Sequence, residues 1–284
     1  MIKHSEIFYS FQGEGRWLGT PSVFLRTFGC NFECRGFGQG RDKSKWVPKD
    51  KMPHVIDPNI NKYKSYQDLP VAQIGCDTSA TWSMLYHHLA MEVSYEKLAE
   101  NITNLIPSKT WYHNLQDTHF ILTGGEPLLW QKKIPFLLQQ KQFWDLKNLT
   151  FETNGSKIIQ KEFYDFWLWN TNDIHVTFAV SPKLSISGEP WHKAINPRAI
   201  ESYMKIPNSE LFFKFVVSDE QDVEEVHRAF KEFDVKVPVY LMPCGGTLDT
   251  LQKNEVRVAN LALQNGFRFS PRAHVNIFGN KWGT

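Results

Sequence analysis

Short apolar segments alternate along the chain with segments of helical periodicity. The apolar runs have the length and composition of buried strands, and they span residues 22–28, 119–123, 149–153, 175–180, 211–217, 237–241 and 267–269. Apolar residues recur at helical spacing over 219–233 and over 250–264. Ser218 and Gln221 form a capping-box pattern before the first of these helices, and Asn265-Gly266 is a stop signal after the second. The chain therefore predicts alternating strands and helices.

This alternation predicts an α/β fold with a parallel sheet and right-handed crossovers, either a barrel or part of one. Polar clusters follow several of the strands: Gly124-Gly125-Glu126, Asn154-Gly155, Ser181-Pro182-Lys183 and Pro243-Cys244-Gly245-Gly246. Ligand sites of parallel α/β folds gather at the carboxyl ends of the strands. We therefore expect these clusters to share one face and to form the active site of a single domain that spans residues 1–284.

Residues 35–75 interrupt the alternation. This segment carries eight Lys and Arg against four Asp and holds four of the 15 prolines, whereas the whole chain has a net charge of only +2. It is predicted to be an inserted loop or small subdomain. A solvated insertion is the simpler interpretation, and an arm that binds a partner or faces nucleic acid is the alternative.

Charge and hydropathy exclude several function classes. A nearly balanced charge does not indicate nucleic acid or an anionic membrane as an obligatory partner. The apolar runs are far shorter than the roughly 20 residues that cross a bilayer, and the start of the chain lacks the pattern of a secretory signal. We therefore expect a cytoplasmic protein, in which the four cysteines favour metal or redox chemistry over disulfides.

Two of the cysteines lie close together in the sequence. Cys30 and Cys34 follow the first predicted strand, in a loop that can turn both thiolates toward one centre, as iron–sulfur ligation requires. Their spacing alone fits two reduced thiols equally well. The neighbouring sequence has to decide between the two interpretations.

Several motifs occur in a particular order along nearly the whole chain. They are Ser10-Phe11-Gln12-Gly13-Glu14-Gly15, Phe24-Leu25-Arg26-Thr27-Phe28-Gly29-Cys30, Cys76-Asp77-Thr78 with Trp82, Thr123-Gly124-Gly125-Glu126-Pro127, Glu152-Thr153-Asn154-Gly155, Val180-Ser181-Pro182-Lys183 and the tail around His274. In this order the motifs resemble those of radical S-adenosylmethionine (SAM) enzymes and, more narrowly, of the 7-carboxy-7-deazaguanine synthase family. The resemblance implies a partial (βα)6-type parallel barrel.

The third cluster ligand departs from the family pattern. The usual motif, Cys-x3-Cys-x2-Cys, would place it at Phe37, but the Cys-Asp-Thr-x-x-x-Trp segment that begins at this ligand in the family starts here at Cys76. We interpret residues 35–75 as an insertion between ligands two and three, which is tolerable because loop-closure cost grows only logarithmically with length. Cys244 is a rival third ligand, and loss of both cluster and activity is a further alternative.

The resemblance also implies the cofactors. Three cysteines (Cys30, Cys34 and Cys76) leave one iron of a [4Fe–4S] cluster open for SAM. The residues implied to hold SAM are Gly124, Gly125, Glu126, Asn154, Ser181, Pro182 and Lys183. The hydroxyl of Thr78 is implied to help bind Mg²⁺, which prefers oxygen ligands.

The implied reaction converts 6-carboxy-5,6,7,8-tetrahydropterin to 7-carboxy-7-deazaguanine and ammonia, as in queuosine-type pathways. The residues implied to contact the substrate are Phe11, Gln12, Gly13, Glu14, Arg26, Thr123, His274 and Thr284. Gln12 and Glu14 suit the pyrimidine edge, and the planar fork of Arg26 suits the carboxylate. A flavodoxin- or ferredoxin-like electron donor and a homodimer are implied as well.

Two other functions remain open from the sequence. One is a radical SAM activase that generates a glycyl radical on a protein partner. The other is a non-catalytic zinc protein that uses the three cysteines and a histidine while the basic insertion binds nucleic acid.

Overall fold

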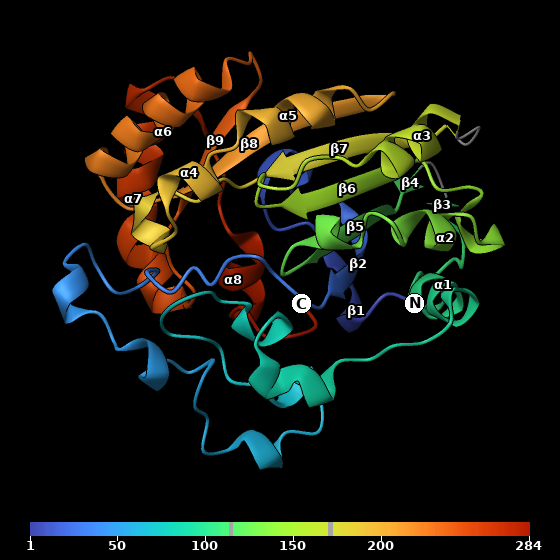
Figure 1. Ribbon diagram of the computed structural model, residues 1–284, viewed down its shortest axis with the longest axis horizontal. Coiled ribbons are helices and arrows are strands. Elements are labelled where there is room, and N and C mark those ends of the chain that lie inside the picture. Colours follow the sequence, from blue (N-terminus) through green and yellow to red (C-terminus); the bar gives the residue numbers. More distant parts are fainter. Residues whose placement is uncertain (114–115, 170–172) are drawn as a thin grey trace.

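The computed structural model describes residues 1–113, 116–169 and 173–284. Its centre is an eight-stranded sheet in the order β1-β2-β5-β6-β7-β8-β9-β10 (Figure 1). The strands are β1 (His4–Phe11), β2 (Pro21–Thr27), β5 (His119–Gly124), β6 (Asn148–Thr153), β7 (His175–Val180), β8 (Ser209–Val217), β9 (Val239–Pro243) and β10 (Arg268–Phe269). From β2 to β10 all neighbours are parallel, and β1 pairs with β2 in the antiparallel sense. The sheet is open between β1 and β10, so the predicted partial barrel is confirmed.

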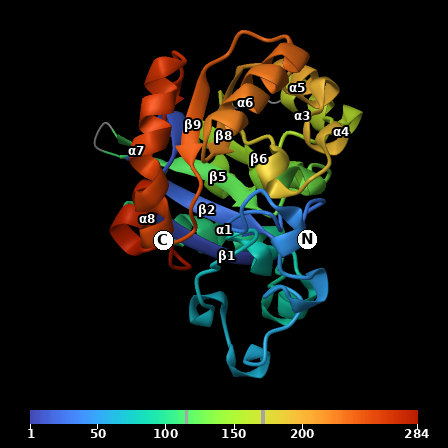
Figure 2. The same cartoon turned by 90° about the vertical axis from the view of Figure 1, so that its left-hand side faces the viewer.

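Helices pack against this curved sheet, and all but the last in the chain cover its outer face. They are α1 (Tyr95–Asn104), α2 (Ile134–Leu138), α3 (Lys161–Trp169), α4 (Trp191–Ala194), α5 (Pro197–Met204), α6 (Glu220–Phe233), α7 (Leu248–Gln264) and α8 (Ala273–Phe278). Figure 2 shows α5 and α6 on one side of the strands and the insertion on the opposite side. A two-stranded ribbon of β3 (Tyr112–His113) and β4 (Gln116–Asp117) lies apart from the main sheet. None of the helices in the described ranges is both long and apolar enough to span a bilayer.

Strand alternation separates the core from the inner face. On β8, Phe213 and Phe215 are fully buried toward the helices, and Phe213 stacks on Phe233 of α6 with centroids 4.7 Å apart. Successive side chains of a strand point to opposite faces, so Lys214 points to the inner face. The same alternation sends Phe151 of β6 into the core and Glu152 inward. The sequence of each strand thus supplies both a core residue and a polar inner wall.

Three sequence predictions need correction. Strand β1 was not predicted, although it forms the antiparallel edge of the sheet. Strand β9 begins at Val239 rather than at 237, after Pro238, which has no N–H to donate to a ladder. Helix α6 does not begin with a Ser218–Gln221 capping box: the carboxylate of Asp219 is the N-cap and accepts from the Asp222 N–H.

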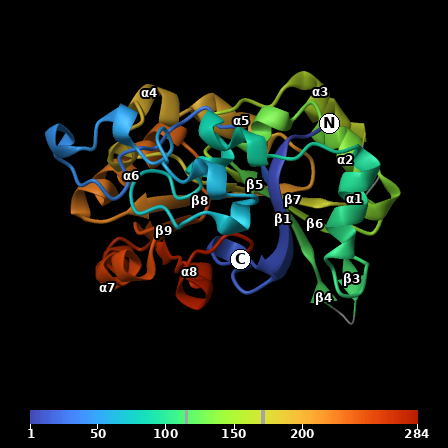
Figure 3. The same ribbon diagram turned by 90° about the horizontal axis from the view of Figure 1, so that it is seen from below.

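The 35–75 segment folds as a series of short 3₁₀ turns that packs back on the barrel: Lys43–Lys45, Lys49–Lys51, Ile60–Lys62 and Tyr66–Asp68. Its two ends meet, because the Gly75 N–H donates to the Phe37 carbonyl at 2.8 Å. Arg41 pairs with Asp219 and Asp222 at the start of α6. In Figure 3 the part of this segment nearest the strands lies beside the C-terminus of the chain.

Candidate active site

A cavity of about 570 Å³ opens at the carboxyl ends of the parallel strands. Residues from β1, β2, β5, β6, β8 and β9, the loop after β7, the insertion and the C-terminal tail line it together. The predicted site residues that line it are Phe11, Gln12, Gly13, Glu14, Arg26, Cys30, Cys34, Cys76, Thr78, Thr123, Gly124, Gly125, Asn154, Ser181, Lys183, His274 and Thr284. Glu126 and Pro182 are the predicted site residues outside this lining.

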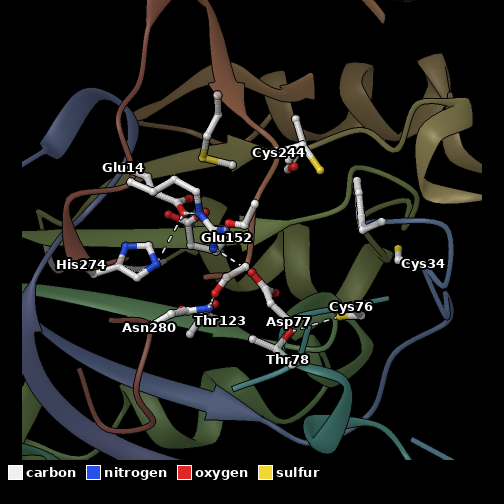
Figure 4. A pocket seen from close by; sticks show the side chains of 18 of the residues that line it. Glu14, Cys34, Cys76, Asp77, Thr78, Thr123, Glu152, Cys244, His274 and Asn280 are labelled. Carbon is white, nitrogen blue, oxygen red and sulfur yellow. Dashed lines mark hydrogen bonds and ion pairs between the residues drawn. The ribbon is translucent and has the colours of Figure 1, made fainter. Parts of the chain in front are cut away.

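Three cysteines meet at one end of the cavity. Cys30, Cys34 and Cys76 pack in one cluster with Phe32 and Phe37, although 41 residues separate the second from the third. Cys244 lines the cavity but packs into the main core instead. Figure 4 shows Cys34 and Cys76 on the same side of the pocket, apart from Cys244. The structure therefore joins the three cysteines that the sequence grouped.

Burial governs the chemistry of these thiols. It raises the pKa of Cys30 to about 12 and also raises the pKa values of Cys34 and Cys76. The free thiols are therefore protonated at neutral pH, and metal ligation has to release those protons. Among the residues that the structure describes, no three His, Cys, Asp or Glu side chains lie close enough together to hold a single metal ion.

The loop after β5 is clamped against the first cysteine. Gly124 has a φ of +119°, and a β-carbon on Gly125 would lie only 2.1 Å from the Gly29 carbonyl oxygen. The Glu126 N–H donates to that same oxygen at 2.8 Å. Only glycine fits at Gly125, because any side chain would push the Gly-Gly loop away from Cys30.

Glu126 lies beneath this loop rather than in the cavity. Its fully buried carboxylate accepts from the Thr153 hydroxyl and the Asn154 N–H, each at 2.8 Å, and from the Leu128 N–H at 3.0 Å. Burial raises the pKa of Glu126. The carboxylate thus ties the β5 loop to the end of β6, and its predicted direct contact with SAM stays a prediction.

Other polar groups surround the cysteine loop. Lys183 donates to the Ser181 hydroxyl at 3.0 Å, and both residues line the cavity. The carboxylate of Glu189, which no sequence motif singled out, accepts from the backbone N–H groups of Glu33 and Cys34 at 2.8 Å each. The Thr78 hydroxyl lies 3.4 Å from the Cys76 sulfur. Its role as a Mg²⁺ ligand stays a prediction.

A buried chain of ion pairs forms the floor of the cavity. The Lys214 ammonium lies 2.8 Å from Glu14 and 2.5 Å from Glu152, and its side chain is only 2% exposed. Arg272 continues the chain from Glu14, at 3.0 Å, to Asp77, at 2.7 Å. Burial opposes ionisation of Glu14, but the cations outweigh it and hold the pKa of Glu14 well below its usual range. Sequence reasoning missed Lys214 and Arg272 as site residues, although a single lysine within an apolar strand was a signal.

The predicted substrate contacts surround this chain. Gln12 donates to Glu152 at 2.9 Å, and its amide oxygen accepts from the Glu14 N–H at 3.1 Å. His274 lies 3.8 Å from Glu14, and its pKa falls to about 4, because burial outweighs the nearby carboxylate. His274 is therefore neutral at neutral pH. Arg26 donates through Nε to Glu6 at 2.8 Å.

No known family model matches the chain. It is similar to curated proteins named 7-carboxy-7-deazaguanine synthase from Pyrobaculum aerophilum (27% identical, covering 99% of this chain and 97% of the relative), Halobacterium salinarum (28%; 97% and 90%) and Hyperthermus butylicus (29%; 98% and 93%). The crystal structure of QueE from Escherichia coli superposes with a TM-score of 0.54 at 19% identity, covering 96% of this chain and 94% of that chain. At that identity the likeness shows the fold. The chain thus shares the QueE fold and resembles 7-carboxy-7-deazaguanine synthases over nearly its whole length.

Proposed function

We propose that the protein is a radical SAM lyase that converts 6-carboxy-5,6,7,8-tetrahydropterin to 7-carboxy-7-deazaguanine. The observation that carries the proposal is the convergence of Cys30, Cys34 and Cys76 at one end of a cavity whose other end is lined by ion-paired carboxylates. The full-length similarity to 7-carboxy-7-deazaguanine synthases supports the same function.

The cysteine end of the cavity fits a cluster and SAM. The three thiols would hold a [4Fe–4S] cluster, which together with SAM supplies a carbon-centred radical after one-electron reduction. Gly124 and Gly125 line this end of the cavity, and the absence of a side chain on either lets the loop after β5 pack on the backbone of Thr27 and Gly29. The groups that would hold SAM beside them are Asn154, Ser181 and Lys183.

The opposite end suits a pterin. Glu14 and Glu152 offer carboxylate oxygens to ring N–H donors, and Lys214 holds both carboxylates in place. Arg26 uses Nε for Glu6, so its terminal nitrogens can take the substrate carboxylate. The cavity walls would keep one C–H bond of the substrate in a fixed orientation, which is the main contribution of such a site.

Further assignments belong to the same proposal. Phe11, Gly13, Thr123, His274 and Thr284 would complete the substrate pocket, and all of them line the cavity. Thr78 would bind Mg²⁺ with substrate oxygens. A flavodoxin- or ferredoxin-like protein would supply the electron, and the enzyme would act as a homodimer, which light scattering can test.

Anaerobic reconstitution with iron and sulfide tests the function. The reconstituted protein is incubated with SAM, a reductant, Mg²⁺ and the carboxypterin, and products are identified by mass spectrometry. We expect a brown protein that forms 7-carboxy-7-deazaguanine only when SAM is present. Uncoupled 5′-deoxyadenosine without this product would favour an activase, and a colourless protein with stoichiometric zinc would favour the zinc hypothesis.

A further inference from the structure

Two segments from distant parts of the chain meet beside Arg26. The Tyr66–Asp68 turn of the insertion packs against the C-terminal tail, where the rings of Tyr66 and Trp282 have centroids 5.3 Å apart. Tyr66 is 2% exposed and belongs to a small apolar cluster with Leu69 and Tyr86, separate from the main core. The insertion thus forms a local core with the tail.

The same two segments surround the Arg26 side chain. Its guanidinium lies between the ring of Phe8, at 5.3 Å from the centroid, and the ring of Trp282, at 5.5 Å. Its Nε donates to one oxygen of the buried Glu6 carboxylate at 2.8 Å. The amide of Gln67 donates to the other oxygen of that carboxylate at 3.3 Å. Of the three side chains that hold Arg26 in place, Trp282 and Glu6 therefore also contact the insertion, and Phe8 is the exception.

This arrangement matters because an arginine side chain is long and has many rotamers. Bidentate recognition of a carboxylate needs the planar fork to be held in one orientation before the ligand arrives. Glu6 and the two flanking rings fix both the direction and the plane of the Arg26 guanidinium. Gln67 in turn orients Glu6, and Tyr66 orients Trp282.

We propose that Tyr66 and Gln67 are positioning residues for substrate binding: through Trp282 and Glu6 they hold Arg26 in the orientation that takes the substrate carboxylate. This inference rests on the proposed function and assigns a role to the insertion. It predicts an effect on binding of the substrate carboxylate alone, because Arg26 is the cation that these contacts hold in place.

Binding of two pterins tests the proposal directly. Reconstituted, SAM-loaded enzyme is titrated with 6-carboxypterin and with a pterin that lacks the carboxylate. In the Tyr66→Ala and Gln67→Ala variants we expect the Kd for 6-carboxypterin to rise about tenfold, equivalent to roughly 1.4 kcal/mol. The Kd for the uncarboxylated pterin should stay within about twofold. In turnover, KM for the carboxypterin should rise while kcat changes little.

Matched variants separate positioning from general damage. Tyr66→Phe keeps the ring against Trp282 and should behave as wild type, as should Lys64→Ala in the same exposed segment. Equal weakening of both pterins, or a normal Kd for 6-carboxypterin in both alanine variants, would overturn the proposal. Wild-type enzyme that binds neither pterin would instead count against the proposed function.

A second measurement does not depend on activity. Trypsin cleavage after the exposed Lys281 requires the half-buried Trp282 to leave the insertion, and intact-mass spectrometry detects loss of Trp282-Gly283-Thr284. We expect this cut to be about tenfold faster in Tyr66→Ala than in wild type or Tyr66→Phe, because local opening sets the cleavage rate. Unchanged cleavage in Tyr66→Ala would refute the contact between insertion and tail.

Discussion

At the scale of single residues, the choice of the third cluster ligand is the sharpest question. Cys76 packs with Cys30 and Cys34, whereas Cys244 packs into the main core. We therefore expect Cys76→Ala to abolish incorporation of the cluster and Cys244→Ala to leave iron content near wild type. Iron and sulfide analysis after anaerobic reconstitution measures this. The reverse pattern would assign the third position to Cys244.

The buried ammonium of Lys214 pairs with two carboxylates, those of Glu14 and Glu152. Lys214→Met leaves Glu152 without its cation, and breaking a buried ion pair typically costs about 3–5 kcal/mol. We expect a clear fall in the thermal unfolding midpoint together with loss of turnover. Adding Glu152→Gln should recover part of the midpoint, because it removes the unpaired charge. If the double variant is less stable than Lys214→Met, the pairing does not account for the loss.

His119 gives the protein a defined pH dependence. It is buried against Trp17, and burial lowers the pKa of His119 to about 4, below the unfolded value of 6.5. Above pH 6.5 neither state is protonated; between pH 6.5 and 4 only the unfolded chain takes a proton, so stability falls by up to about 1.4 kcal/mol per pH unit. Other histidines also lower the stability as the pH falls, so the contribution of His119 has to be measured with a variant that lacks it.

His119→Phe keeps a ring at this position and removes the titration. The unfolding midpoints of wild type and variant are compared at pH 7.5, 6.5 and 5.5 under anoxic conditions. We expect wild type to lose more stability than the variant as the pH falls. Parallel curves would show that His119 titrates normally in the folded protein.

The sequence identified these site residues unevenly. Cys76 was grouped with Cys30 and Cys34, beside which it packs, because it begins a segment with a distinctive order, Cys-Asp-Thr. Glu189 was not found, because its contact with the Cys34 N–H joins residues 155 apart in a single hydrogen bond. Lys214 and Arg272 were overlooked for a related reason. Each forms ion pairs with carboxylates on other strands or loops, so a short sequence window around either cation contains neither of its partners.

At the scale of elements, the loop after β5 makes a strong prediction. A β-carbon on Gly125 would meet the Gly29 carbonyl oxygen at 2.1 Å and the Cys30 β-carbon at 2.9 Å. Gly125→Ala should therefore displace the loop and abolish SAM binding by equilibrium dialysis. Gly266→Ala is the control, because at φ +68° it is strained by about 1–2 kcal/mol but has nothing within 4 Å. Normal SAM binding in Gly125→Ala would separate this loop from the SAM site.

Periodicity located the parallel strands but not the edges of elements. The buried strands read as continuous apolar runs, which is why β5 to β8 were predicted nearly in full. Strand β1 (His4–Phe11) is an edge strand in which polar and apolar residues are mixed. Its pairing with β2 depends on the folded structure and cannot be recognised from its own sequence. The N-cap of α6 was placed one residue early because Ser218 and Asp219 both suit that role, and only the observed bond to Asp222 decides.

At the scale of the whole molecule, residues 35–75 stood out in the sequence, but their place in the fold did not. Their basic charge and prolines marked this segment, yet nothing local shows that Tyr66 reaches Trp282, more than 200 residues away. Its charges also gave little guidance, because Lys49 pairs with Glu33, and Lys45 with Asp42, at the surface. The segment reaches the Arg26 side of the cavity through the contact of Tyr66 with Trp282, while Arg41 pairs with carboxylates at the start of α6.

Removing the insertion tests which properties of the site depend on it: cluster incorporation, SAM cleavage or affinity for the carboxypterin. Because the Gly75 N–H bonds to the Phe37 carbonyl, a Gly-Gly linker can replace residues 38–74 and leave the cysteine loops in place. We expect this variant to incorporate iron and to cleave SAM, while its affinity for the carboxypterin falls at least tenfold, roughly 1.4 kcal/mol. Its unfolding midpoint should also fall, since Tyr86 and Ala80 lose their apolar partners.

The control for this deletion keeps the insertion and removes its charge. A variant with Lys43, Lys45, Lys62 and Lys64 replaced by glutamine should retain the substrate affinity of wild type, because these exposed side chains lie outside the cavity lining. Iron content, 5′-deoxyadenosine formation and carboxypterin affinity are measured side by side for both variants. A folded deletion variant without iron would mean that the insertion holds Cys76 in place. Weakened binding in the glutamine variant would mean that its charge, and not its packing, acts on the substrate.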